Sequence, residues 1–335
     1  MGSGRFSNRF KSYRYLNGNY LVHGSSYGSA FFTISKRALR YGEELKSCFP
    51  DSIDLKITNK CRYGCPFCHE SSTPEGNSFN PEKTKEILSQ LPVKPIELAI
   101  GGGNVLEIID KESTEEFFGW LQNRGFRIRI TINLKDLMST GDERKDKRII
   151  DFINKYAEGL GISITDLKLI DRNKVSQLYL TASDIIDATD LGQDLRYGPQ
   201  IVYHIIAGIF PKDDLKFLID HTRNSVLVLG YKQWGRAKDN ELPNLTEWKT
   251  AMEDIIMNTE TDLKGLGFDN LALEQLEIRN VIDENHWKRI YLGDEGSCSM
   301  YIDAVKGEYA LNSRSPERVG WNDIKLLDYY ASLSK

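Results

Sequence analysis

The chain has 335 residues, of which 40% are hydrophobic, 10% aromatic and 27% charged, and its mean hydropathy is −0.43. This composition is typical of a soluble globular protein with one large domain or two ordinary ones, and it excludes wholesale disorder. No apolar run approaches the roughly 18 residues of a membrane-spanning helix, and no apolar signal segment follows Met1, so we expect a cytoplasmic protein without a membrane partner.

The net charge of −4 is unevenly placed along the chain. Residues 1–42 contain seven basic residues and no acidic one: Arg5, Arg9, Lys11, Arg14, Lys36, Arg37 and Arg40. Such an arm is either an ordinary solvated surface or a binding site for phosphates or an acidic peptide.

The first predicted element is a β-hairpin within residues 13–22. Asn17-Gly18 stands there between alternating aromatic segments, which is a strong two-residue turn signal. A second extended stretch, Ser29–Ile34, follows, so we expect residues 1–50 to form a β-rich extension.

From residue 51 onward, short apolar strands alternate with amphipathic helices. The predicted strands are Ser52–Ile57, Ile96–Ile100, Arg127–Ile132, Gly161–Ile164, Gln200–Ile206 and Val226–Leu229. The predicted helices lie near residues 81–90, 114–124, 146–157, 173–179 and 212–222. This alternation indicates an α/β fold with a parallel sheet, which is either an open doubly wound sheet or a full or partial barrel.

The last part of the chain differs in character. The pattern predicts acidic helices over residues 240–285. The spacing of Trp248, Met252, Ile255 and Ile256 places them on one apolar helix face. Strand-like segments return at Ser299–Val305 and Gly307–Leu311. We therefore divide the chain into an extension (1–50), a barrel (51–238) and a mixed α+β extension that caps the barrel (239–335).

Three of the five cysteines are crowded together directly after the first strand of the barrel. Cys61, Cys65 and Cys68 have the spacing C-x3-C-x2-C. Three thiolates on one loop can hold three irons of an iron–sulfur cube and leave the fourth iron open to a small chelating ligand.

Three alternatives stay open for this cluster. One is a zinc site that adds His69, although the adjacent Cys68-His69 pair is awkward for closing a tetrahedron. Another is a structural disulfide. The third is an electron-carrying cluster, which normally has four cysteine ligands, whereas only the isolated Cys48 and Cys298 remain.

The motif C-x3-C-x-φ-C, with Phe67 as its aromatic residue, resembles the signature of the radical S-adenosylmethionine (radical SAM) superfamily. The resemblance covers residues 52–236 and implies a partial (β/α)6 TIM-like barrel. It implies that Cys61, Cys65 and Cys68 hold an oxygen-sensitive [4Fe–4S] cluster whose open iron chelates SAM. An electron from a reductant such as flavodoxin or ferredoxin then cleaves SAM to methionine and a 5′-deoxyadenosyl radical.

The resemblance also assigns cofactor contacts beside Phe67. The turn after the second strand, Gly101-Gly102-Gly103-Asn104, would contact the SAM amino group through Gly102, Gly103 and Asn104. Asn104 stands where the family usually has an acid. Asn133 and Ser163, at the ends of the next strands, would lie near the ribose, and Gly208 near the adenine.

Further residues could face the substrate. Lys232 and Arg236 follow the sixth strand and suit an anionic or aromatic group, although an ordinary surface loop explains them equally well. Residues 297–301, with Asp303, could complete the pocket, and Cys298 is either a hydrogen donor or an ordinary half-buried thiol. His204 reads as a core histidine, so we assign no catalytic residue beyond the cluster ligands.

The sequence thus predicts a single-cluster radical SAM enzyme without a cysteine-rich auxiliary-cluster domain. It would abstract a hydrogen atom from a peptide or small-molecule substrate. The alternatives are a radical SAM modifier of a nucleotide or nucleic acid, suggested by the basic arm, and a zinc-stabilised binding protein.

Overall fold

A computed structural model describes residues 12–25, 31–34, 46–137, 142–165, 200–221, 224–241, 243–258, 265–284, 287, 291 and 293–333. The predicted helix at 173–179 lies outside these residues. So do all the basic residues of the arm except Arg14. Among the described helices, none combines the length and apolar character needed to cross a membrane.

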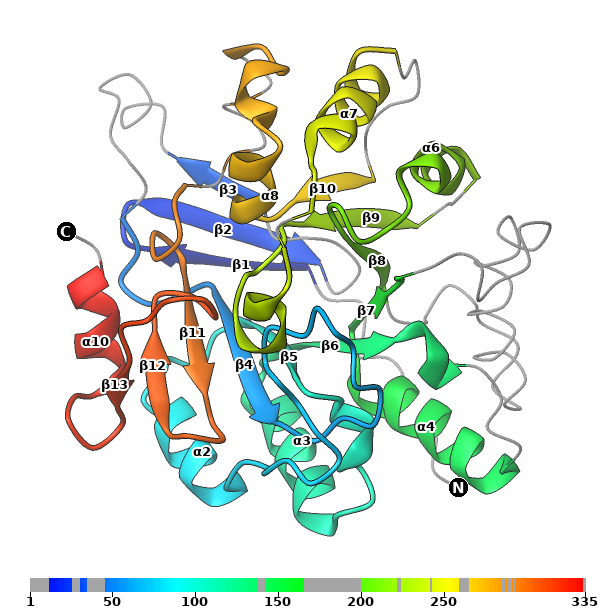
Figure 1. Ribbon diagram of the computed structural model, residues 1–335. Helices are drawn as coiled ribbons and strands as arrows, with labels where there is room; N and C mark the ends of the chain where they lie inside the picture. The colour runs from blue at the N-terminus through cyan, green and yellow to red at the C-terminus, as the bar shows by residue number, and fades with distance from the viewer. Residues whose placement is uncertain are drawn as a thin grey trace.

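The six predicted barrel strands form neighbouring strands of one sheet, in chain order and all parallel (Figure 1). They are β4 (Ser52–Thr58), β5 (Glu97–Gly102), β6 (Arg127–Asn133), β7 (Gly159–Ser163), β8 (Gln200–Ile206) and β9 (Ser225–Leu229). Within the described residues the two edges of the sheet do not pair with each other. The α/β architecture with an open, partial barrel is therefore confirmed.

The sheet extends beyond the six barrel strands on both sides, and the strand-like segments predicted at Ser299–Val305 and Gly307–Leu311 supply two of the added strands. β10 (Leu266–Phe268) pairs parallel with β9, and β11 (Ser299–Asp303) pairs parallel with β4. β12 (Glu308–Ala310) and β13 (Val319–Gly320) continue antiparallel from β11. The segment after residue 238 thus adds strands to the barrel sheet itself.

Side chains along a strand of a pleated sheet point alternately to its two faces, and β4 shows what this does here. Ile53, Leu55 and Ile57 of β4 point to one face and are fully buried in the hydrophobic core. Ser52, Asp54 and Lys56 point to the other face and line a cavity. The core thus lies on the face of the sheet that the helices cover, and the cavity lies on the opposite, concave face.

Helices connect the strands and cover the core face (Figure 1). They are α2 (Pro81–Leu88), α3 (Glu112–Arg124), α4 (Glu143–Tyr156), α6 (Lys212–His221), α7 (Thr246–Asn258), α8 (Asn270–Gln275) and α10 (Leu326–Leu333). α2 begins where the sequence predicts, because the Asn80 side chain accepts a hydrogen bond from the Lys83 amide (3.0 Å) and Pro81 occupies the first turn. Such a cap stabilises a helix by about 1 kcal/mol.

The predicted hairpin is also confirmed. β1 (Ser12–Asn17) and β2 (Tyr20–Ser25) pair antiparallel around Gly18, and β3 (Phe31–Ile34) adds a third strand. Tyr15 and Asn17 donate hydrogen bonds of 2.9 Å to Asp51, which immediately precedes β4. The hairpin therefore lies at the amino ends of the barrel strands, opposite the end from which the cysteine loop leaves.

Candidate active site

The concave face of the sheet encloses a cavity of about 960 Å³. Inward-facing residues of β4 to β9 line it, together with residues of β10, β11 and the loops that follow the strands. Ten of the twelve predicted site residues contribute to this lining: Cys61, Cys65, Phe67, Cys68, Gly102, Gly103, Asn104, Asn133, Ser163 and Lys232. The structure thus brings them to one place, whereas Gly208 and Arg236 lie outside the lining.

The three clustered cysteines lie on the loop between β4 and α2, at the carboxyl end of the strands. The Cys61 amide donates to Thr73 O (2.9 Å), which closes the loop back on itself, and the Cys68 amide donates to Cys65 O (3.2 Å). All three thiols are free and partly exposed. Their sulfur atoms are therefore available to a metal centre at the mouth of the cavity.

The cysteines influence one another electrostatically. Burial is the main cause that raises the pKa of the Cys61 and Cys65 thiols, and the neighbouring thiolates raise it further. Neutral thiols are therefore favoured until a metal replaces their protons.

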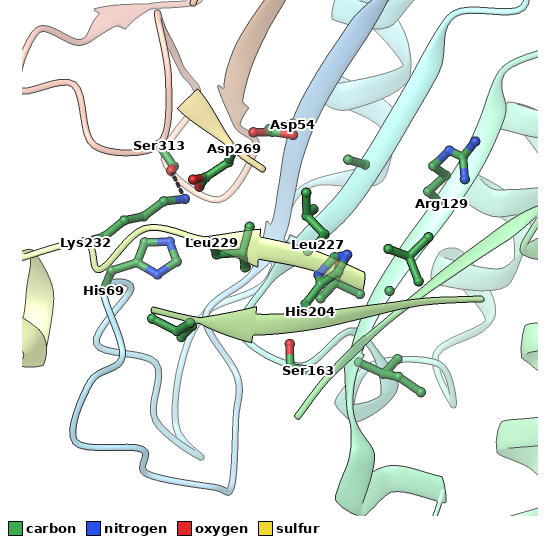
Figure 2. A pocket seen from close by; sticks show the side chains of 18 of the residues that line it. Asp54, His69, Arg129, Ser163, His204, Leu227, Leu229, Lys232, Asp269 and Ser313 are labelled. Atoms are coloured by element: carbon green, nitrogen blue, oxygen red, sulfur yellow. Dashed lines mark hydrogen bonds between the residues drawn. The ribbon is translucent and has the colours of Figure 1, made fainter. Parts of the chain in front are cut away.

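Arg236 lies outside the cavity lining and stabilises the cysteine loop by hydrogen bonds to its backbone. Its Nε donates to Cys65 O (3.0 Å), one guanidinium nitrogen donates to Ser72 O (2.8 Å), and its amide donates to Cys68 O (3.0 Å). The sequence suggested that Arg236 faces a substrate. In the structure its guanidinium instead donates hydrogen bonds to backbone carbonyls of the cysteine loop. Lys232 does face the cavity, where its Nζ donates to Ser313 Oγ (2.9 Å; Figure 2).

The glycine turn after β5 packs tightly against the start of the cysteine loop. The amides of Gly103 and Asn104 donate to Thr58 O (2.7 Å) and Lys60 O (2.6 Å). A Cβ on Gly102, whose φ is +114°, would lie 2.5 Å from Thr58 O, and one on Gly103 would lie 2.3 Å from Lys60 O. Both glycines are therefore required for backbone packing, whatever they contact in the cavity.

We expect Gly102→Ala to destabilise the protein by roughly 2–4 kcal/mol, because it combines a strained φ with a backbone clash. Gly119→Ala is the matched control, since nothing lies within 4 Å of its added Cβ. Gly119 lies in α3, where alanine should leave the stability of the protein unchanged or raise it by up to about 1 kcal/mol. Chemical denaturation of both variants tests the prediction, and equal unfolding free energies would refute it.

Asn104 is buried and its polar atoms are engaged within the protein. Its side-chain oxygen caps the 3₁₀ helix η2 (Val105–Glu107) by accepting from the Leu106 amide (3.1 Å), and its Nδ2 donates to both oxygens of Asp136 (3.0 and 3.1 Å). The Asn104 side chain thus has a structural role within the protein, and its predicted cofactor contact stays a prediction.

Asp136 was not identified from the sequence, yet it connects three parts of the site. Besides Asn104, it accepts hydrogen bonds from Arg62 (3.2 Å), from the Tyr63 hydroxyl and from the Asn133 amide (3.1 Å). Its side chain is fully buried. An acid three residues after the polar end of β6 was the available sequence signal.

Gly208 lies in the turn after β8 and packs away from the cavity. Its φ is +80°, and an added Cβ would lie 2.4 Å from Pro243 Cβ. Close packing against the segment before α7 therefore explains this glycine, and its predicted contact with adenine has no counterpart in the cavity lining.

Deeper in the cavity, His204 lies against β7. A Cβ on Gly161 would be 2.4 Å from His204 Cε1, so the glycine makes room for the ring. Burial, and then repulsion from Lys232, lower the pKa of His204 to about 4. The ring is therefore a neutral group on the cavity wall at neutral pH.

The lowered pKa of His204 predicts a pH-dependent stability. The unfolded histidine titrates near its ordinary pKa of 6.5, so the unfolded state binds the proton first, and stability is lost as the pH falls from about 6.5 to about 4. His204→Gln should reduce the difference in unfolding free energy between about pH 7.5 and about pH 4.5 by roughly 1–3 kcal/mol. Urea titrations at both pH values measure this, and an unchanged difference would contradict it.

A buried ion-pair group supports the cysteine loop from inside the cavity. Lys56 Nζ lies 2.5 Å from Glu70 and 3.1 Å from Asp303, and the Tyr301 hydroxyl donates to Glu70 (3.2 Å). His69 Nε2 lies 3.4 Å from Glu70. Burial alone would raise the pKa of Glu70. His69 and Lys56 together outweigh this effect and hold the pKa of Glu70 well below its usual range.

Cys298 lines the cavity at the amino end of β11, where its carbonyl accepts from the Asp51 amide (2.8 Å). Burial raises the pKa of this thiol to about 12. It is therefore a neutral thiol at the opposite end of the strands from the cysteine loop.

No protein-family model matches the sequence, and no curated protein matches it significantly. Among solved structures, SuiB from Streptococcus suis is similar at 13% identity with a TM-score of 0.49, over 88% of this chain and 68% of its own. Coproporphyrinogen III oxidase (HemN) from Escherichia coli, a radical SAM enzyme, is 14% identical with a TM-score of 0.42, over 79% of this chain and 66% of its own. Methylornithine synthase (PylB) is 14% identical with a TM-score of 0.44, over 86% of this chain and 83% of its own. Likenesses this distant concern the fold alone, so the assignment of a function depends on the residues of the cavity.

Proposed function

We propose that this chain is a radical SAM enzyme that binds one [4Fe–4S] cluster through Cys61, Cys65 and Cys68. The observation that carries the proposal is the position of the C-x3-C-x-φ-C segment. It lies on the loop after the first of six parallel strands, at the mouth of a cavity lined by those strands. Active sites of parallel barrels lie at this carboxyl end of the strands.

The donor set supports a cube better than a single ion. Zn–S bonds of about 2.3 Å require the ligands to lie within about 4 Å of one another. Among the described residues, no three His, Cys, Asp or Glu side chains gather closely enough to bind one metal ion. His69, the fourth ligand of a zinc site, faces Glu70. Three cysteines on one loop suit a cube, in which each ligand binds a different iron.

When bound, the cluster would supply the electron that cleaves SAM, and the resulting 5′-deoxyadenosyl radical would take a hydrogen atom from the substrate. The chain's own residues would bind, orient and exclude water. Gly102 and Gly103 present backbone to the cavity without side chains in the way. Asn133 and Ser163 offer polar groups on two adjacent strands, where they pair in register.

The size of the cavity supports a peptide or small-molecule substrate. About 960 Å³ is near the upper end of the range for small-molecule sites, about 300–1,000 Å³. We infer that SAM occupies the part next to the cysteine loop. The remaining space would take a small molecule or one side chain of a peptide. The electron would come from a reductant such as flavodoxin or ferredoxin.

Electron paramagnetic resonance of the reconstituted, reduced protein tests this proposal. An open iron would bind SAM directly, so we expect the spectrum of the reduced cluster to change when SAM is added. Adenosine is the matched control, because it lacks the chelating amino and carboxylate groups. A spectrum that SAM leaves unchanged, or a protein that loads zinc instead of iron and sulfide, would contradict the proposal.

A further inference from the structure

The charged side chains of the cavity wall are nearly all paired. Glu97 forms an ion pair with Arg129 (2.5 Å). Asp269 accepts from the amides of Gly230 (2.9 Å) and Ala272 (2.7 Å). Lys56 and Glu70 pair with each other, and Asp51 accepts from the hairpin. These groups satisfy one another and hold the wall in shape.

Asp54 is different. It lies in the middle of β4, and its carboxylate faces the cavity (Figure 2). Among the described residues nothing forms a hydrogen bond or an ion pair with it, although it is accessible from the cavity. Its strand neighbours in register are Ala99 on β5 and Tyr301 on β11, and neither brings a positive charge.

The surroundings of Asp54 do not neutralise it either. Burial raises its pKa, and the carboxylates of Asp269, Glu97 and Glu295 raise it further. Lys232 attracts the Asp54 carboxylate, but its Nζ is hydrogen-bonded to Ser313. A carboxylate that faces a cavity without a partner among the described residues is free to pair with a ligand of opposite charge.

We propose that Asp54 binds a cationic group of the substrate, an ammonium or a guanidinium. This inference rests on the proposed function and deepens it, because it limits the substrate to an amine or to a peptide with a basic side chain. Asp54 lies two residues before Lys56 along β4, which is about 6.6 Å farther from the cysteine loop. A cation held by Asp54 therefore leaves the rest of the substrate between this anchor and the mouth of the cavity.

Calorimetric titration of the reconstituted protein, with SAM present, tests the inference. The probes are n-butylammonium and n-butylguanidinium, and the neutral control is 1-pentanol. We expect the cations to bind to the wild type at least roughly 10-fold more tightly than 1-pentanol, and Asp54→Asn to remove this preference. Asp213→Asn, which removes an exposed carboxylate on α6, is the matched control and should bind like the wild type.

Stability and SAM affinity provide two further readouts. Because Asp54 has no partner among the described residues, Asp54→Asn should melt at the same temperature as the wild type or higher. A lower melting temperature would reveal a structural partner and overturn the inference. So would a wild type that does not prefer the cations, or an Asp54→Asn protein that binds them unchanged. A loss of SAM affinity in Asp54→Asn would overturn it too, since Asp54 would then bind the ammonium of SAM.

The inference and the proposed function can fail separately. If the protein forms 5′-deoxyadenosine but shows no cation preference that depends on Asp54, the inference is wrong and the function stands. If Asp54 binds the cations but SAM is not cleaved, the cavity is a cation site of another kind of protein and the proposed function is wrong.

Discussion

Cys65→Ala is expected to lose the iron–sulfur cluster and all cleavage of SAM. Two thiolates cannot hold a cube that needs three, so iron and sulfide per chain after reconstitution should fall at least roughly 10-fold. The Cys61 and Cys68 variants should behave alike. Iron and sulfide analysis, together with the visible absorbance of the cluster, measures the loss.

Cys48→Ala is the matched control for these variants. Cys48 is exposed and lies outside the cavity lining, so its loss should leave the iron content unchanged. The apo forms of all four variants should melt close to the wild type, because the three loop cysteines are only partly buried. A Cys65→Ala protein with the iron content of the wild type would overturn the assignment of the ligands.

Asp136→Asn is expected to destabilise the protein and to impair cluster loading. An amide would place an NH₂ group among donors that now all point at a carboxylate, namely Arg62, Tyr63, Asn104 and the Asn133 amide. Leaving buried donors without acceptors should lower the free energy of unfolding by roughly 2–4 kcal/mol.

Chemical denaturation and iron analysis of Asp136→Asn measure both effects. Asp213→Asn removes an exposed carboxylate and should change the unfolding free energy by less than about 0.5 kcal/mol. If Asp136→Asn were as stable as this control and loaded iron normally, Asp136 would not hold the cysteine loop to the glycine turn.

The order and direction of the barrel strands could be predicted from the sequence because the pattern is strong. Residues such as Ile128, Ile130 and Ile132 alternate with polar ones, and the intervening helices carry clear start signals such as Asn80-Pro81. β10 could not be predicted, since three residues, Leu266–Phe268, are too few for a periodic signal. The pairing of β11 with β4 joins residues about 250 positions apart, and local patterns carry no such information.

The site could be predicted as a set of residues but not as a set of contacts. The cysteine spacing located the loop, and polar strand ends such as Asn133 and Ser163 located the cavity. Arg236 was expected to face a substrate, yet it donates to carbonyls of a loop some 170 residues earlier in the chain. Sequence patterns show which residues carry charge, whereas their partners depend on the fold.

The most direct test of the central claim is the product of the reaction. The protein is reconstituted anaerobically with iron and sulfide and incubated with SAM and dithionite, and the products are identified by mass spectrometry. We predict 5′-deoxyadenosine and methionine, both absent when Cys65→Ala replaces the wild type. Intact SAM with a fully loaded cluster, or a chain that binds zinc and no iron, would contradict the assignment as a radical SAM enzyme.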